Sequence, residues 1–291
     1  MTPKFIKTKL KGLGSLAKKG INAFGIKMRY RSTETSPTAI KDILAVLDPR
    51  FRSPVLSPNA IENILGVLDP YFRSPLLSMY RDEPQLGTDG QLHPISEVSG
   101  IPPSVGIWIY NLCVSVRPKA TIEIGMAYGF STLYFLAAIA KCQIGHHTAI
   151  DPFQSSLSYG IGLRHAQTVA STKGSDSAFR LIEDRSDRVA TDLARTNCTF
   201  EVILIDGNHR FDDVLVDFYL YAPLCTIGGY IIFDDMWMSS IQTAVAFVRS
   251  NRSDFVEVRS AEPRICVFQK VGDDSREWTD FRQFVVAPST Y

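Results

Sequence analysis

The sequence lacks the patterns that mark several classes of protein. Its 5 cysteines are scattered without a Cys-x-x-Cys pair, so neither a zinc site nor a disulfide framework is indicated, and a reducing cytoplasm is the simplest compartment. No apolar run approaches the roughly 20 residues that a membrane span needs. No Gly-x-Gly-x-x-Gly segment is present, which disfavours a dinucleotide site. The basic residues 1–30 contain no continuous apolar stretch, so no secretory signal is expected.

Charge is unevenly distributed along the chain. Residues 1–32 hold nine Lys/Arg and no acidic residue, whereas the whole chain holds 31 basic and 30 acidic residues. An acidic body argues against general nucleic-acid binding, and the basic head leaves room for a local anionic partner. Apolar residues recur in this head at helical spacing, which fits an amphipathic helix on an anionic membrane or on another subunit. Its four glycines leave open a solvated, frayed terminus instead.

A tandem repeat follows the basic head. AIKDILAVLDPRFRSPVLS, from Ala39, matches AIENILGVLDPYFRSPLLS, from Ala60, at an offset of 21 residues. Each copy predicts a short helix that is stopped by Asp-Pro and followed by an Arg-Ser-Pro turn. Two copies cannot cover their own apolar faces, so we expect a helical layer on the body of the protein or on a second subunit. A lid over a substrate pocket is the alternative.

The remainder of the chain alternates short apolar runs with segments of helical periodicity. The expected strands are 120–124, 147–150, 179–182, 202–205, 230–233, 255–258 and 265–269, and the expected helices are 131–141, 162–170, 188–195, 212–221 and 241–249. Continuous apolar strands separated by helices predict an α/β fold with a parallel sheet covered on both faces. No helix separates the last two strands, so these should form an antiparallel hairpin at one edge.

Ligands of such a sheet bind beyond the carboxyl ends of its strands, and two of these ends suit a nucleoside cofactor. The first strand runs into a glycine turn that opens a helix, in which Gly125 and Gly129 allow close approach of a ligand and Ser131 is placed to cap the helix. The second strand ends at Asp151, where an acid can accept both hydroxyls of a ribose. A tight connection and a turn-forming Asp before Pro152 are the alternatives.

Acidic residues follow the fourth and fifth strands. Asp206 ends the fourth strand, and Asp234 and Asp235 end the fifth. Three acids brought together repel one another unless they are protonated or bridged by a cation. Their oxygen ligands suit Mg²⁺, or Ca²⁺ or Mn²⁺ in its place. The alternative is that Asp234 and Asp235 cap the next helix.

These motifs resemble the class I S-adenosylmethionine-dependent methyltransferases. The resemblance rests on Glu123-Ile-Gly125 through Ser131, on Asp151, on Asp206-Gly-Asn208-His209 and on Gly228-Gly229 through Asp235, and it covers about residues 85–270. Within this class, the motifs are most similar to those of the small-molecule O-methyltransferases, a branch that includes the macrocin-type sugar enzymes and, more distantly, catechol O-methyltransferase. It implies a Rossmann-like, mostly parallel seven-stranded sheet of order 3-2-1-4-5-7-6 with the last strand antiparallel. The implied division is a basic and helical extension over 1–84 and a methyltransferase domain over 85–291.

The resemblance also implies roles for individual residues. The glycine turn would hold the methionine end of the cofactor, Asp151 its ribose, and Ser186 and Asp187 its adenine. The implied metal ligands are Asp206, Asp234 and Asp235. The full set of cofactor-binding residues that we predict is Glu123, Gly125, Met126, Tyr128, Gly129, Ser131, Asp151, Ser186, Asp187 and Asp206.

One position departs from the related sugar enzymes. They place an aspartate base two residues after the first metal ligand, where this chain has Asn208, and an amide accepts no proton at neutral pH. His209 is then the best candidate for the base, because an ordinary imidazole pKa near ~6.5 suits proton abstraction. A structural imidazole beneath the site is the alternative. Asp206, Asn208 and His209 are the predicted catalytic residues.

The expected activity is transfer of the methyl group of S-adenosylmethionine to a hydroxyl of a small, sugar-containing or phenolic natural product, with a divalent metal. The expected partners are this acceptor and further copies of the chain, with no nucleic acid, and the basic N-terminus is expected to contact a membrane surface or a subunit. Two other functions stay open: a nicotinamide-dependent oxidoreductase on a similar sheet, and a non-catalytic adaptor with a degenerate cofactor site.

Overall fold

A seven-stranded sheet organises the computed structural model, which describes residues 56–95, 100–172 and 176–286. Its strands are β3 (Ala120–Ile124), β4 (His146–Ile150), β5 (Phe179–Ile182), β6 (Phe200–Ile205), β7 (Cys225–Phe233), β8 (Phe255–Val258) and β9 (Cys266–Lys270). They lie in the order β5-β4-β3-β6-β7-β9-β8, and β9 is antiparallel to both of its neighbours. Counted from β3, this is the predicted order 3-2-1-4-5-7-6, and the predicted edge hairpin is confirmed.

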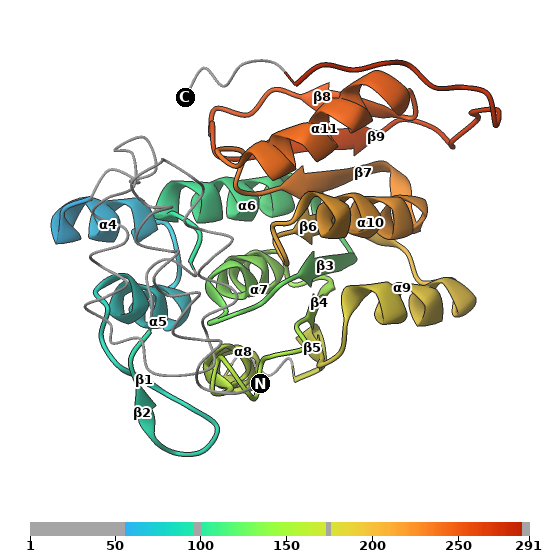
Figure 1. Ribbon diagram of the computed structural model, residues 1–291. Coiled ribbons are helices and arrows are strands. Elements are labelled where there is room, and N and C mark those ends of the chain that lie inside the picture. The colour runs from blue at the N-terminus through green and yellow to red at the C-terminus, as the bar shows by residue number, and fades with distance from the viewer. Residues whose placement is uncertain (1–55, 96–99, 173–175, 287–291) are drawn as a thin grey trace, which may run out of the picture. The chain divides into compact units, whose positions relative to one another are not determined.

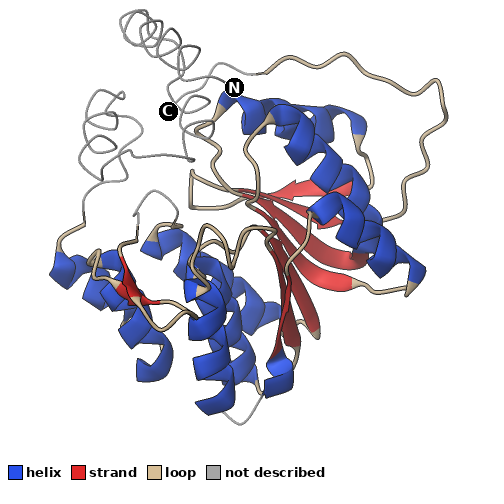
Figure 2. Cartoon of the chain, turned by 60° about the horizontal axis from the view of Figure 1, so that its bottom comes forward, coloured by secondary structure: helices blue, strands red, loops and turns tan. Residues whose placement is uncertain are grey.

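Helices cover both faces of this sheet (Figures 1 and 2). One layer contains α6 (Pro103–Val116), α7 (Phe130–Cys142) and α8 (Ile161–Thr172), and the other contains α9 (Ser186–Arg195), α10 (Phe211–Tyr221) and α11 (Ser239–Asn251). Short 3₁₀ turns precede β5, at Asp176–Ala178, and β7, at Ala222–Leu224. The helices divide between the two faces because every crossover is right-handed but the direction of travel along the sheet reverses. The chain runs outward from β3 to β5 and then back through β6 to β7. All five predicted helices are present, and α6 is an additional one.

Two further helices belong to the second copy of the tandem repeat. Helix α4 (Pro58–Leu65) is capped by Ser57, whose hydroxyl accepts a hydrogen bond from the Ala60 amide, and α5 (Pro70–Tyr80) is capped by Asp69. Pro70 starts α5 rather than ending a helix, because a proline in the first turn leaves no amide unsatisfied.

The Arg-Ser-Pro turn predicted after this Asp-Pro pair is wrong. Arg73, Ser74 and Pro75 lie inside α5. The helix continues through Pro75 because it buries an apolar face, formed by Phe72, Leu76 and Met79, whose packing outweighs the lost backbone hydrogen bond.

The second repeat copy packs on the body of the protein, as predicted. Buried residues of α4 and α5 share one core with α6 and α7, and the Tyr80 hydroxyl lies 3.0 Å from the Tyr134 hydroxyl. The first copy up to residue 55, and the basic head, lie outside the described residues. The boundary between residues 84 and 85 stays a prediction. None of the described helices is long and apolar enough to cross a membrane.

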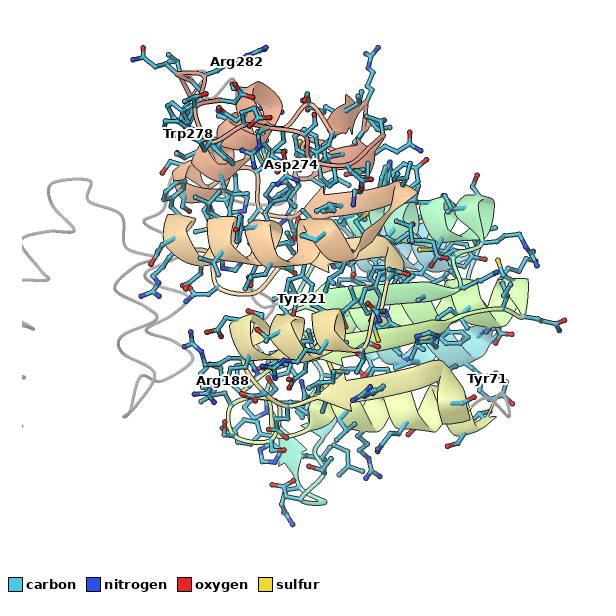
Figure 3. All side chains as sticks on the ribbon, turned by 90° about the vertical axis from the view of Figure 1, so that its right-hand side faces the viewer. Tyr71, Arg188, Tyr221, Asp274, Trp278 and Arg282 are labelled. Atoms are coloured by element: carbon cyan, nitrogen blue, oxygen red, sulfur yellow. The ribbon has the colours of Figure 1, made fainter. Side chains whose placement is uncertain are left out.

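A short hairpin and the C-terminal tail complete the fold. The hairpin of β1 (Gln85–Leu86) and β2 (Leu92–His93) places the His93 ring on the Tyr159 ring at 3.9 Å. After β9, the tail returns along α11, where the Asn251 side chain exchanges two hydrogen bonds with the Arg282 backbone (Figure 3). Trp278 of this tail is 95% exposed.

Strand register sets up the functional edge of the sheet. Ile124 pairs with Ile150 on one side and with Ile205 on the other, and Ile205 pairs with Phe233. The residues that follow these strands therefore lie side by side at the carboxyl edge: Gly125, Asp151, Asp206 and Asp234.

Candidate active site

Gly125 stands where three strand ends meet. Its amide donates to the Ile150 carbonyl at 2.8 Å, and the Asp206 amide donates to the Ile124 carbonyl at 2.9 Å. Gly125 has φ +91°, and a side chain here would overlap the Asp206 carbonyl oxygen. Gly129 has φ +84°, and a Cβ there would lie 2.9 Å from the Gly162 Cα. Both glycines are therefore required by positive φ and by close backbone approach.

Glu123 anchors the turn from beneath. Its carboxylate is fully buried and accepts hydrogen bonds from the hydroxyls of Ser131, at 2.6 Å, and Thr132. His147 Nε2 lies 3.1 Å from the same carboxylate. The prediction that Ser131 caps α7 is wrong, because Gly129 is the N-cap residue and the Ser131 hydroxyl is directed to Glu123. The Glu123 and Ser131 side chains thus fix the conformation of the turn.

Asp151 is tied to the same turn. One carboxylate oxygen accepts from the Ala127 amide at 2.7 Å and from the Met126 amide at 3.3 Å, and the other accepts from the Phe153 amide at 2.8 Å. A carboxylate accepts about four hydrogen bonds, so about one acceptor direction is left for a ligand. Asp151 therefore closes the turn, and its contact with both ribose hydroxyls stays a prediction.

The other predicted cofactor residues are arranged less directly. The side chains of Met126 and Tyr128 are buried in the core beside the turn. Ser186 is the first residue of α9, and its carbonyl accepts from the Tyr221 hydroxyl at 2.9 Å. Asp187 forms an exposed ion pair with Arg185 at 2.9 Å. Contacts of these residues with a cofactor stay predictions.

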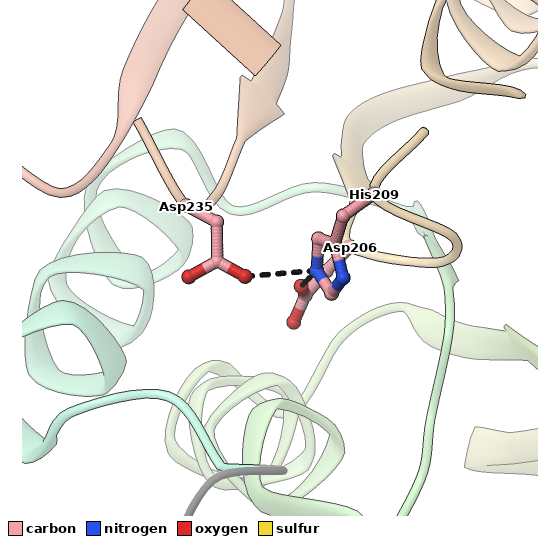
Figure 4. A group of neighbouring side chains, drawn as sticks. All are labelled: Asp206, His209 and Asp235. Carbon is pink, nitrogen blue, oxygen red and sulfur yellow. Dashed lines mark hydrogen bonds and ion pairs between the residues drawn. The ribbon is translucent and has the colours of Figure 1, made fainter. Parts of the chain in front are cut away.

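Asp206, His209 and Asp235 come together at the ends of β6 and β7 (Figure 4). His209 Nε2 lies 2.8 Å from Asp235 Oδ2 and 3.4 Å from Asp206 Oδ1. The Ser240 hydroxyl donates to the His209 carbonyl at 2.6 Å and holds this loop against α11. The predicted convergence of Asp206 and Asp235 is therefore seen, with an imidazole between them.

Asp234 lies against a residue that the sequence analysis missed. Arg264, just before β9, places Nε 3.4 Å from Asp234 Oδ1, and its terminal nitrogen pairs with Asp235 Oδ1. The same Asp235 oxygen accepts from the Trp237 indole at 2.7 Å. A signal for Arg264 existed: Cys266 of the antiparallel β9 pairs with Phe233, so the residues before β9 lie beside those after β7.

These contacts set the protonation of the cluster. Burial lowers the pKa of His209, but its bonds to Asp206 and Asp235 outweigh burial and raise the pKa to about 10. Burial raises the pKa of Asp235, but His209 and Arg264 outweigh it and lower the pKa to about 2. Burial also raises the pKa of Asp206, and together with the neighbouring acids it raises that of Asp234 well above the ordinary value. His209 thus holds a proton at neutral pH.

Asn208, in the position of the base of related enzymes, has a buried amide oxygen without a hydrogen-bond partner among the described residues. Such an oxygen is costly unless a ligand supplies a donor. Asn208 is therefore suited to bind a donor group, not to remove a proton.

The chemistry of the cluster partly suits a divalent metal. Asp206, His209 and Asp235 each offer a ligand atom, and these atoms lie within 4.8 Å of one another. Both oxygens of Asp235 and one of Asp234 are, however, already paired with Arg264 or His209. In this arrangement the predicted set of Asp206, Asp234 and Asp235 does not fit a metal unless Arg264 leaves, so no chemical step is assigned to one.

Comparison with known proteins agrees with this fold. Residues 122–236, less than half of the chain, match the family model described as a methyltransferase domain, which agrees with the resemblance to class I methyltransferases. Two curated proteins that match are uncharacterized. One, from Sinorhizobium fredii, is 25% identical over 134 residues, 45% of this chain and 14% of that protein. The other, from Acanthamoeba polyphaga mimivirus, is 39% identical over 49 residues, 16% of this chain and 22% of that protein. The chain thus matches less than a quarter of either relative.

Solved structures share the fold at low sequence identity. An SAH-bound methyltransferase of Podospora anserina, PaMTH1, is 11% identical with a TM-score of 0.52, covering 83% of this chain and 99% of its own. The cofactor-bound protein Rv0187 from MTB is 12% identical with a TM-score of 0.53, covering 83% and 100%. A methyltransferase from Geobacter sulfurreducens is 14% identical with a TM-score of 0.50, covering 76% and 100%.

Proposed function

We propose that this protein uses S-adenosylmethionine to methylate a hydroxyl oxygen of a small molecule. The observation that carries the proposal is the Gly125 turn, where the backbones of β3 and β6 meet with no room for a Cβ atom and Asp151 closes the turn from the next strand. The methyltransferase-domain match over residues 122–236 supports it, as does the SAH bound in the Podospora protein of the same fold.

The cofactor position borders the acid cluster. S-adenosylmethionine supplies an electrophilic methyl group when it is bound. The backbone of the Gly125 turn and the Asp151 carboxylate hold the cofactor, and Asp206 is the residue common to both regions, since its carbonyl lies against Gly125 and its side chain faces His209. Methyl transfer between two held groups gains much of its rate from this positioning.

Asp206 is the better proton acceptor of the cluster in this arrangement. His209 already carries its proton, whereas burial gives Asp206 a raised pKa, and a base is most effective when its pKa approaches the working pH. Asp206 removes the hydroxyl proton of the acceptor, His209 with Asp235 orients the Asp206 carboxylate, and the Asn208 amide oxygen accepts a hydrogen bond from the acceptor or the cofactor.

Ligand-dependent melting of the full chain tests the cofactor assignment. S-adenosylhomocysteine at about 100 times its Kd should stabilise the fold by about 2.7 kcal/mol, whereas NADH should leave the Tm unchanged. Asp151→Asn should reduce the shift, whereas Asp192→Asn, at an exposed residue of α9 that pairs with Arg195 and has no predicted role in cofactor binding, is the control and should leave it unchanged. A shift with NADH alone would support the oxidoreductase, and no shift with either ligand would support the non-catalytic adaptor.

The acceptor is tested separately. Methyl-labelled S-adenosylmethionine is incubated with a panel of phenolic and sugar hydroxyl compounds and with amine and thiol analogues. Label should enter the hydroxyl compounds, and Asp206→Asn should slow this by about 10²-fold or more. Transfer only to amines or thiols would contradict O-methylation while leaving the cofactor assignment intact.

A further inference from the structure

We propose that Arg264 is the resident cation of the acid cluster and takes the position that the family resemblance assigns to a divalent metal. The site of the native protein then binds neither Mg²⁺ nor Mn²⁺ at millimolar concentration, and Arg264 acts as a positioning residue that fixes Asp235 for its contact with His209. The catalytic meaning of this inference rests on the proposed function, but its binding test does not.

Acidic and basic side chains alternate along one series of contacts. Asp234 and Asp235 both contact the Arg264 guanidinium, and the other oxygen of Asp235 contacts His209, which also reaches Asp206. The side chains of Asp234 and Asp235 are only 1% and 7% exposed. Each buried acid therefore has a cation of the chain itself within ion-pair distance, which is what three neighbouring acids require.

A dication would compete directly with Arg264. It would need oxygens of Asp235 that are now paired, and it would lie within a few ångströms of a guanidinium that stays charged at every physiological pH. Like charges at this range repel strongly where water is excluded. Expelling Arg264 instead would separate a buried guanidinium from its carboxylates, which is also costly.

Arg264 is held in place by its backbone and by its loop. The Met236 amide donates to the Arg264 carbonyl at 2.8 Å, so the segment after Asp235 and the segment before β9 are bonded together. Two residues earlier, the Glu262 carboxylate accepts from the Ser104 hydroxyl of α6 at 3.0 Å. Asp235 itself has φ +57°, and the Trp237 indole donates to it. Cation and acid are therefore placed by separate contacts before any ligand arrives.

A Mn²⁺ titration of the full-length protein, followed by electron paramagnetic resonance of the free ion, tests the proposal. The native protein should show no saturable site up to millimolar Mn²⁺. Arg264→Gln removes the charge at similar size and should bind Mn²⁺ at least about tenfold more tightly, because the repulsion is gone. Arg264→Lys should remain like the native protein. Arg195→Gln is the matched control: Arg195 pairs with Asp192 in the last turn of α9, next to the amino end of β6 and not to the carboxyl end where the cluster lies.

The outcomes separate the inference from the proposed function. Saturable Mn²⁺ binding by the native protein that Asp235→Asn abolishes would overturn the inference. It would also be overturned if the Arg264→Gln variant unfolds cooperatively, and is therefore folded, but gains no Mn²⁺ site. If Arg264→Gln fails to fold, the native protein and Arg264→Lys still decide, since saturable Mn²⁺ binding by either that Asp235→Asn abolishes overturns the proposal. The Tm shift that S-adenosylhomocysteine produces in the same samples reports on the cofactor site. Loss of this shift would count against the proposed function and not against Arg264 as the resident cation. A positioning role further predicts that Arg264→Lys retains the elevated His209 pKa in a histidine NMR titration, whereas Arg264→Gln alters it.

Discussion

Two strand ends at the carboxyl edge of the same sheet handle buried acids in different ways. At the end of β3, Glu123 accepts hydrogen bonds from the hydroxyls of Ser131 and Thr132, and His147 Nε2 lies 3.1 Å from its carboxylate. At the end of β7, Asp235 is satisfied by Arg264 and His209. The first arrangement fixes a turn whose backbone can face a ligand. The second places Asp235 between two basic side chains, one of which, His209, also reaches Asp206. We call the turn around Gly125, with Glu123 and Asp151, the shape region. We call the cluster of Asp206, His209, Asp234, Asp235 and Arg264 the charge region.

The largest effect should come from breaking the shape region at Gly125. Gly125→Ala forces a side chain onto the Asp206 carbonyl at φ +91°, so the β3 and β6 ends must separate. We expect a loss of about 3–5 kcal/mol in the free energy of unfolding, together with loss of S-adenosylhomocysteine binding. Urea unfolding and ligand-dependent melting measure both.

Gly90→Ala is the matched control for this prediction. Gly90 also has positive φ, at +78°, but no atom lies within 4 Å of the position that a Cβ would take. It should cost only about 1 kcal/mol and leave ligand binding intact. Equal costs at the two glycines would mean that backbone conformation, not the meeting of strand ends, decides the effect.

The charge region should give stability a pH dependence through His209. The folded pKa of His209, about 10, lies above the ordinary value of 6.5, so its stabilisation is complete below pH 6.5 and is lost as pH rises toward 10. His209→Gln should therefore cost about 2–3 kcal/mol at pH 6 and progressively less up to pH 10. Unfolding by urea at several pH values measures this difference.

His165 supplies the control for that titration. It is buried beside Gln85, and burial, followed by the charge of Arg164, lowers its pKa to about 4. His165→Gln should therefore change stability by a constant amount between pH 7 and 10. A sloping difference for His165, or a flat one for His209, would contradict the assigned protonation.

A smaller effect is expected from the buried acid of the shape region. Glu123→Gln keeps the size of the side chain, but its amide cannot accept hydrogen bonds from Ser131 and Thr132 on both arms. The loss should be about 1–2 kcal/mol by urea unfolding. Glu257→Gln, which weakens a half-exposed pair with Arg249, should cost less than about 1 kcal/mol. If the two variants lost the same stability, the hydroxyl contacts of Glu123 would carry no special weight.

The sequence predicted the shape region better than the charge region. Strand ends follow from apolar runs and turn residues, which is why the positions of Gly125, Asp151 and Asp206 at one edge were foreseeable. Arg264 was missed because it reaches the site only through the antiparallel placement of β9 against β7, a contact between segments about 30 residues apart.

Other misses share this dependence on distant partners. The Ser131 hydroxyl bonds Glu123 across the turn rather than its own helix end. The His209 pKa depends on two acids from different strands, so its ordinary value gave the wrong protonation state.

The smallest effect is expected at a third buried acid, which has neither arrangement. Asp217 of α10 is 4% exposed, and burial raises its pKa to about 6 despite a hydrogen bond with Ser186. A folded pKa above the unfolded value of 3.8 means that the folded state binds the extra proton, so this carboxyl lowers stability as pH rises from about 4 to about 6. Asp217→Asn stays neutral and should stabilise the protein by about 1 kcal/mol at pH 7, with no gain at pH 4. Urea unfolding at both pH values measures it, and a loss of stability at pH 7 would mean that the charged carboxylate is favourably solvated where it lies beneath the Asp206-Gly207 loop.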